Sequence, residues 1–135
     1  MTNRLAREVM TENPACCTPD TPLDQVAMLM REHDCGEIPV IDPAEQPIGV
    51  VTDRDIVCRV VADGKNPMAY PAGICMSQPV ATVPVDAPLG DVIATMELHQ
   101  VRRVPVVDEL GRCVGMISQA DLVREISRDT GNIPD

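Results

Sequence analysis

The sequence predicts an α/β (α+β) protein made of two copies of one β-α-β-β-α unit. Residues 10–57 align with residues 76–123 without a gap after a shift of 66 positions, which identifies an internal repeat. Each copy has one segment with apolar residues at helical spacing, followed by two short runs rich in Val and Ile that turn residues separate. A unit of this size leaves apolar surface uncovered, so we expect the two copies to stack on each other.

The first half of each copy is expected to form a strand and an amphipathic helix. A short helix over residues 5–10 precedes the first copy, and residues 16–18 form its first strand. Residues 20–21 stand ahead of Pro22, an arrangement that favours a capped helix start. The apolar residues that define the two helices are Leu23, Val26, Ala27 and Met30 in the first copy and Leu89, Val92, Ile93 and Met96 in the second.

The second half of each copy is expected to form an antiparallel strand pair and a second helix. The strand-like runs lie at residues 38–42 and 48–52, and at residues 104–108 and 114–118. The apolar residues of the second helices are Ile56, Val57, Val60 and Val61 in the first copy and Leu122, Val123 and Ile126 in the second.

The repeat predicts the domain boundaries. We expect one domain over residues 8–63, a linker over residues 64–73, and a second domain over residues 74–130. Residues 64–73 are assigned as a linker because Gly and Pro are frequent there.

Composition excludes several classes of function. A formal charge of −10 would repel nucleic-acid phosphates, and no basic stripe offsets it, so we expect no nucleic-acid partner. No apolar run has the length of a membrane span or of a signal-peptide core, so we expect a cytoplasmic protein with no membrane partner. The six cysteines form no C-x-x-C pair and have no His at ligand spacing, which predicts no metal site. Because no catalytic motif is present, we expect no enzyme and no catalytic residue.

Each copy has a hydroxyl residue three positions before an aspartate at the expected start of its second helix. The pairs are Thr52 with Asp55 and Ser118 with Asp121. This spacing is that of a helix capping box, which alone would explain both pairs. A helix N-terminus also offers N–H groups to a phosphate, and an aspartate beside it can accept hydrogen bonds from both hydroxyls of a ribose. The two roles do not exclude each other, so both pairs are candidate ligand-binding residues.

The repeated motifs resemble a known family. The pattern hydrophobic-Pro-Val-hydrophobic-Asp at residues 38–42 and 104–108 is followed by Gly-x-x-Thr/Ser-x-x-Asp at residues 49–55 and 115–121. In combination these motifs resemble the cystathionine-β-synthase (CBS) domain, present twice and covering nearly all of the chain. The amino-acid sequence of residues 99–106 further resembles that of the stand-alone tandem CBS proteins.

The resemblance implies a tandem CBS-domain pair with pseudo-two-fold symmetry. It also implies clefts between the two CBS motifs that hold adenine nucleotides or related adenosyl ligands, and a homodimer formed through helices. In these clefts, Asp55 and Asp121 would bind ribose hydroxyls, and Thr52 and Ser118 would help to bind phosphate.

The two copies differ beside these pairs, so we expect their sites to differ. Arg102 and Arg103 precede the proline-containing strand of the second copy, and guanidinium groups match phosphate oxygens well. The equivalent positions of the first copy are Gly36 and Glu37, and a glutamate there should lower affinity for a phosphorylated ligand. We therefore expect the second site to bind a nucleotide and the first to be empty or to take a less charged adenosyl ligand.

The adenine base would need an apolar slot. Because the chain has no Phe or Trp and a single Tyr, the expected walls are aliphatic side chains. The residues we assign to these walls are Val83, Val101 and Val104.

Two functions of different classes follow from these observations. In the first, the chain is a non-catalytic sensor that binds AMP, ADP, ATP or S-adenosylmethionine as a regulatory ligand and signals to a partner protein. In the second, it is a constitutive or thiol-responsive interaction scaffold with vestigial clefts, in which Cys16, Cys17 or Cys35 acts as the switch. Neither the partner nor the physiological ligand is specified by the sequence.

Overall fold

The computed structural model describes residues 3–131, with side chains through residue 128. The chain divides into two compact units. Residues 15–80 form one, here called the first-repeat unit. Of the described residues, 3–14 together with 81–131 form the other, here called the second-repeat unit.

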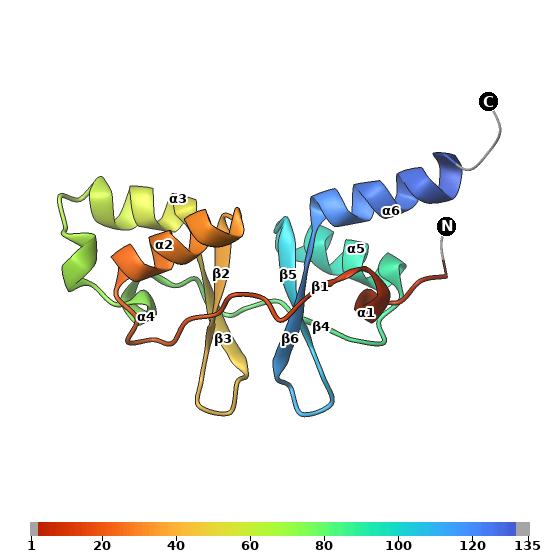
Figure 1. Cartoon of the computed structure of the whole chain (residues 1–135), viewed down its shortest axis with the longest axis horizontal. Coiled ribbons are helices and arrows are strands. Elements are labelled where there is room, and N and C mark those ends of the chain that lie inside the picture. Colours follow the sequence, from red (N-terminus) through yellow and green to blue (C-terminus); the bar gives the residue numbers. More distant parts are fainter. Residues whose placement is uncertain (1–2, 132–135) are drawn as a thin grey trace. The chain divides into compact units, whose positions relative to one another are not determined.

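The first-repeat unit places its helices on a two-stranded hairpin (Figure 1). Strands β2 (Glu37–Ile41) and β3 (Pro47–Thr52) pair antiparallel, as the two apolar runs predict. Before them lies α2 (Leu23–His33), and after them α3 (Asp53–Ile56) continues into a π-helical turn, η1 (Val57–Val61). The unit ends with the 3₁₀ turn η2 (Pro67–Ala69) and the short helix α4 (Ala72–Cys75).

The second-repeat unit repeats this plan with a larger sheet (Figure 1). Its strands follow the order β1-β6-β5-β4, with β5 antiparallel to β6 and parallel to β4. The strands are β1 (Thr11–Glu12), β4 (Val83–Pro84), β5 (Arg103–Val107) and β6 (Cys113–Ser118). The helices are α1 (Ala6–Val9), α5 (Leu89–His99) and α6 (Gln119–Gly131).

Each unit has its own hydrophobic core. In the first-repeat unit Leu23 and Val26 of α2 pack with Ile38 and Val51 of the hairpin, all four with 0% exposure. The second-repeat unit uses the equivalent positions of α5, β5 and β6, where Leu89 and Val92 are also fully buried. The helical spacing and the strand runs thus identify the residues that form both cores.

The segment before each repeat packs in the unit of the other repeat. The N-terminal segment completes the second-repeat unit, and the segment between the two repeats completes the first-repeat unit. Ala6 donates a backbone hydrogen bond to the carbonyl of Ala87 (2.8 Å) and is fully buried in the second-repeat unit. Ala72 likewise donates to Thr21 (2.8 Å) and is fully buried in the first-repeat unit. Residues 64–73, expected as a linker, therefore contain η2 and the first two residues of α4, and Ala72 among them belongs to the first core. The repeat boundaries 8–63 and 74–130 stay predictions, and they differ from this spatial division.

Two local expectations are wrong. The residues ahead of Pro22 do not cap α2, because Pro22 itself is the N-cap and the Thr21 hydroxyl accepts a hydrogen bond from the Thr18 amide (3.0 Å). The first strand at residues 16–18 is reduced to one isolated bridge, between Cys17 and Val40. Within residues 3–131, no helix combines the length and apolar composition that crossing a membrane requires.

Candidate functional site

The start of α3 carries the predicted pair of the first repeat. The Asp55 amide donates to the Thr52 hydroxyl (3.0 Å), and the Thr52 amide donates to Asp55 Oδ2 (2.9 Å). This is the reciprocal capping box that the spacing predicts. Two further groups contact the same carboxylate: Ser77 Oγ at 3.4 Å from Oδ2 and Arg59 Nε at 3.8 Å from Oδ1.

The start of α6 carries the equivalent pair of the second repeat. The Ser118 amide donates to Asp121 Oδ2 (2.8 Å), and the Asp121 amide donates to the Ser118 hydroxyl (3.1 Å). The other oxygen, Oδ1, is ion-paired with Arg124, whose side chain is 72% exposed. One carboxylate oxygen of Asp121 therefore holds the helix start, while the other meets only a solvent-exposed cation among the residues that the structure describes.

The strand register places the predicted arginines beside this helix start. Arg103 lies directly opposite Ser118 in the β5–β6 pair, and the Arg102 carbonyl accepts a hydrogen bond from the Gln119 amide (2.7 Å). Arg103 is half-buried and Arg102 is exposed. Within residues 3–131, no hydrogen bond or ion pair joins either guanidinium to another side chain.

The first repeat has opposite chemistry at the same register. Glu37 lies opposite Thr52 in the β2–β3 pair, and the Gly36 carbonyl accepts from the Asp53 amide (2.9 Å). This confirms that Gly36 and Glu37 are the structural equivalents of Arg102 and Arg103. Because Glu37 is 9% exposed, a negative charge lies close to the start of α3 with little solvent screening.

The three valines assigned to a base-binding wall lie in or against the core of the second-repeat unit. Val83 and Val104 are 2% and 0% exposed, and Val101 is half-buried against the same cluster. Their contribution to a base-binding wall stays a prediction.

The structure adds residues that the motif did not identify. A pocket of about 200 Å³ borders Asp121 and is lined also by Glu8, Val9, Arg124, Glu125 and Arg128. Glu125 is 7% exposed and pairs with Arg4 at 2.6 Å and with Arg128 at 3.5 Å. The position of Arg124, one helical turn after Asp121, was the available sequence signal, because residues three or four apart share a helix face.

Two of the six cysteines, Cys17 and Cys75, lack the chemistry that a thiol switch needs. All six are free. Burial, and to a lesser degree the neighbouring Cys16, raises the pKa of Cys17 to about 12. Burial also raises the pKa of Cys75, with a further increase from Asp55 and a partial decrease from Arg59. Since the thiolate is the reactive form, both cysteines are poor nucleophiles near neutral pH.

We expect thiol labelling to separate these sites. In iodoacetamide labelling at pH 8 followed by peptide mass spectrometry, the exposed Cys58 should react first. Cys17 and Cys75, which are 4% and 2% exposed, should react only as fast as the protein unfolds. Cys58→Ser should remove the fast phase and leave the slow one unchanged. Rapid labelling of Cys17 in folded protein would contradict the expectation.

The family is evident from comparison with known sequences. The CBS domain matches residues 6–62 and residues 72–128. The chain therefore belongs to the CBS domain family and carries the domain as a tandem pair, as the motifs predict. CBS domain pairs are regulatory modules, and no catalytic family is indicated.

Relatives of the stand-alone tandem type are among the similar proteins. The chain is 36% identical over 121 residues to Hypoxic response protein 1 of Mycobacterium tuberculosis. The aligned region covers 90% of this chain and 84% of that protein. It is also 36% identical over 118 residues to a protein of Methanopyrus kandleri, covering 87% of this chain. This chain spans 58% of the length of the Methanopyrus relative.

Solved structures confirm the fold class. The crystal structure of Hypoxic Response Protein I matches with a TM-score of 0.83 at 36% identity, covers 90% of this chain and 98% of that one, and contains two coordinated zinc ions. A CBS domain pair in complex with 5′-methylthioadenosine and S-adenosyl-L-methionine matches with a TM-score of 0.84 over 95% of this chain and 99% of that one. Its 23% identity supports the fold alone. Among residues 3–131 of this chain, no three His, Cys, Asp or Glu side chains lie close enough to hold a metal ion.

Proposed function

We propose that this CBS pair is a non-catalytic sensor that binds an adenine nucleotide at the start of α6 and signals to a partner protein. The observation that carries the proposal is the register of Arg103 opposite Ser118. That register pairs Arg103 with the last residue before α6, a helix N-terminus whose amides and dipole favour a phosphate. The ligands that such a site would bind are AMP, ADP and ATP, with S-adenosylmethionine as the less charged adenosyl alternative.

The ribose would bind at Asp121 by exchange with Arg124. Asp121 Oδ2 is held by the Ser118 amide, so Oδ1 is the oxygen available to ribose hydroxyls once Arg124 moves away. An ion pair with a partner that is 72% exposed contributes little stability, so this exchange costs little. The released guanidinium could then turn to the ligand phosphate, together with Arg103.

The same chemistry predicts weak nucleotide binding in the first-repeat unit. Glu37 stands where Arg103 stands in the other unit, and its charge opposes a phosphate. Asp55 is also more fully engaged than Asp121, because Ser77 and Arg59 both contact it. We therefore propose that the first site is empty or takes a less charged adenosyl ligand.

Signalling requires that the ligand favours one conformation of the pair over another. We propose a homodimer as the signalling species, because each unit exposes apolar side chains on its second helix. Val57 and Val61 are 57% and 55% exposed, and Val123 is 58% exposed. We also propose the cytoplasm as the compartment, where six free cysteines stay reduced. In the alternative of a thiol-responsive scaffold, Cys17 is the least suited of the three proposed switch residues, because its pKa is raised to about 12.

Titration calorimetry with AMP, ADP, ATP and S-adenosylmethionine tests the proposal. We expect saturable binding of at least one nucleotide, with an affinity reduced at least about tenfold by Asp121→Asn and by Arg103→Met, since each loses a charged hydrogen-bond partner. Asp55→Asn is the matched control in the other unit and should leave nucleotide affinity within about twofold. Circular dichroism checks that each variant is folded. Equal affinity for Asp121→Asn and the parent protein would overturn the assignment.

A further inference from the structure

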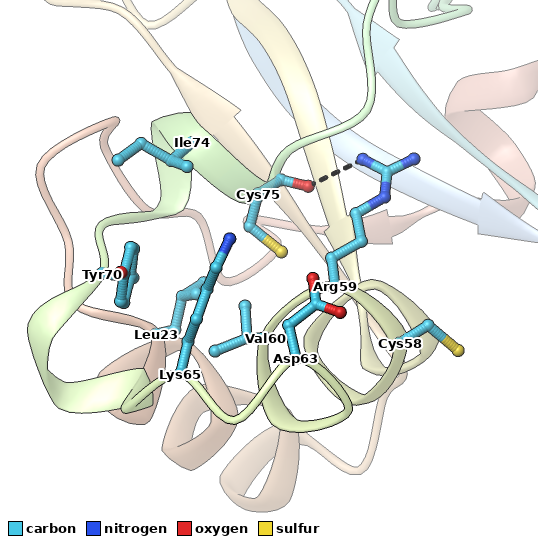
Figure 2. Close-up of a pocket in the computed structure, with 9 residues that line it drawn as sticks. All are labelled: Leu23, Cys58, Arg59, Val60, Asp63, Lys65, Tyr70, Ile74 and Cys75. Atoms are coloured by element: carbon cyan, nitrogen blue, oxygen red, sulfur yellow. Dashed lines mark hydrogen bonds between the residues drawn. The ribbon is translucent and has the colours of Figure 1, made fainter.

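A second pocket lies in the first-repeat unit, between the end of η1 and α4 (Figure 2). Its volume is about 290 Å³, just below the range of about 300–1,000 Å³ for drug-sized ligands, so it fits a small metabolite. It is separate from the nucleotide site proposed at α6, which belongs to the other unit. The residues that carry the following argument are Leu23, Val60, Asp63, Lys65, Tyr70 and Ile74.

The pocket brings together two residues that occur once each in the chain. Lys65 is the only lysine of the 135 residues, and Tyr70 is the only aromatic residue. The Lys65 ammonium lies 5.4 Å from the centre of the Tyr70 ring. Within residues 3–131, no hydrogen bond or ion pair engages that ammonium. Its three donors therefore remain available to a ligand.

Backbone contacts hold the segment that carries these residues. Gly64 adopts a left-handed conformation (φ 72°), which turns the chain back after η1, and the Lys65 amide donates to the Val60 carbonyl (2.9 Å). At the other end, the Tyr70 carbonyl accepts from the amide of Leu23 at the start of α2 (3.0 Å). The backbone is thus anchored at both Lys65 and Tyr70, while the Lys65 side chain itself is exposed.

The lining combines two positive groups, Arg59 and Lys65, with one negative group, Asp63, and apolar walls. Figure 2 shows the Lys65 amine and the Asp63 carboxylate extending into the pocket from the same segment. The Arg59 guanidinium is turned to the Cys75 carbonyl, to which its Nη1 donates at 3.2 Å. The walls are aliphatic, and Ile74 is 67% exposed at the rim, which leaves apolar surface for a ligand to cover.

We propose that this pocket binds an apolar α-amino acid of about leucine size. The ligand carboxylate would pair with Lys65 and the ligand ammonium with Asp63. The aliphatic side chain would pack against Leu23, Val60 and Ile74, beside the Tyr70 ring. A zwitterionic head group pairs with both Lys65 and Asp63, whereas a simple carboxylate would be repelled by Asp63 and a simple amine would be repelled by Lys65. The third charged group of the lining, Arg59, is already engaged by Asp55 (3.8 Å) and by the Cys75 carbonyl.

Among its described side chains, the second-repeat unit does not offer this chemistry. Positions 74 and 70 correspond to Glu8 and Arg4 after the shift of 66 residues, so a carboxylate and a guanidinium stand where the first-repeat unit has aliphatic and aromatic side chains. The pocket at the equivalent place is lined mainly by charged residues, among them Glu8, Arg124 and Arg128. We therefore expect one amino-acid site per chain.

Fluorescence of Tyr70 tests the proposal directly, because no other aromatic residue contributes to the signal. Titration with L-leucine should give a saturable change. Three related molecules separate its parts: 4-methylpentanoate lacks the ammonium, 3-methylbutylamine lacks the carboxylate, and L-alanine lacks the apolar body. Each should bind at least about tenfold more weakly than leucine. Equal binding of leucine and 4-methylpentanoate, or no saturable change with leucine, would overturn the proposal.

Variants are compared by equilibrium dialysis with labelled leucine, because replacing Lys65 also changes the Tyr70 signal. Lys65→Met and Asp63→Asn should each weaken binding at least about tenfold, while Arg31→Met, which removes an exposed cation elsewhere in the unit, should not. Undiminished binding by Lys65→Met would also overturn the proposal. Leucine binding should survive Asp121→Asn, so failure of the nucleotide proposal and failure of this one give different results.

Discussion

Leu23→Ala and Leu89→Ala should each lower the free energy of unfolding of their own unit by about 3 kcal/mol. Both side chains open the first helix of a repeat, and they are 0% and 1% exposed. They belong to different clusters, Leu23 to the core of the first-repeat unit and Leu89 to that of the second-repeat unit. Truncation removes buried methyl groups and leaves a cavity, so the loss has both a transfer and a packing component.

Urea unfolding followed by two probes measures the effect. Tyr70 fluorescence reports only on the first-repeat unit, whereas far-ultraviolet circular dichroism reports on both. Leu23→Ala should therefore move the fluorescence midpoint strongly to lower urea. Met28→Ala is the control on the same helix; its side chain is 42% exposed, so it should cost less than about 0.5 kcal/mol. A similar cost for Met28→Ala would show that burial on α2 is assigned to the wrong face.

The features that were predicted from the sequence are those determined by local patterns. The hairpins follow from paired runs of Val and Ile around a turn, and α2 and α5 follow from apolar residues at helical spacing. The capping boxes at Thr52 and Ser118 depend on a separation of three residues, which is readable in one dimension. The register of Arg103 opposite Ser118 follows from the length of the hairpin and was also accessible.

Features that depend on distant segments were not predicted. Nothing local indicates that Ala6 bonds to Ala87, or that a segment rich in Gly and Pro contributes Ala72 to a core. The pocket that is lined by both Lys65 and Tyr70 depends on the turn at Gly64. An assignment of this segment as a linker from its composition gives no information about such a turn. The sequence therefore identifies the helix starts as candidate sites but gives no indication of the pocket.

Gly115→Ala should destabilise the second-repeat unit by about 1–3 kcal/mol, which is typical of overpacking. A Cβ at Gly115 would collide with Met10 Sδ and would lie 2.8 Å from its Cγ and 3.1 Å from its Cβ. The Met10 thioether would have to change rotamer, and Met10 Cβ cannot follow it, because the Met10 amide bonds to Ala6 (2.9 Å) and the next residue, Thr11, pairs with Met116. The Met10 side chain, just before β1, therefore packs directly on Gly115 of the neighbouring strand β6.

A double-mutant cycle identifies the cause. Met10→Ala removes the colliding atoms beyond Cβ, so the double variant should recover at least about 1 kcal/mol relative to the sum of the two single changes. Gly49→Ala with Met76→Ala is the comparison in the other unit. There the added Cβ would also lie 3.0 Å from the Ser77 carbonyl oxygen, a backbone atom that truncating Met76 leaves in place. The recovered free energy of unfolding should therefore be smaller at Gly49. If the losses of Gly115→Ala and Met10→Ala are additive, contact with Met10 is not the reason that position 115 requires glycine.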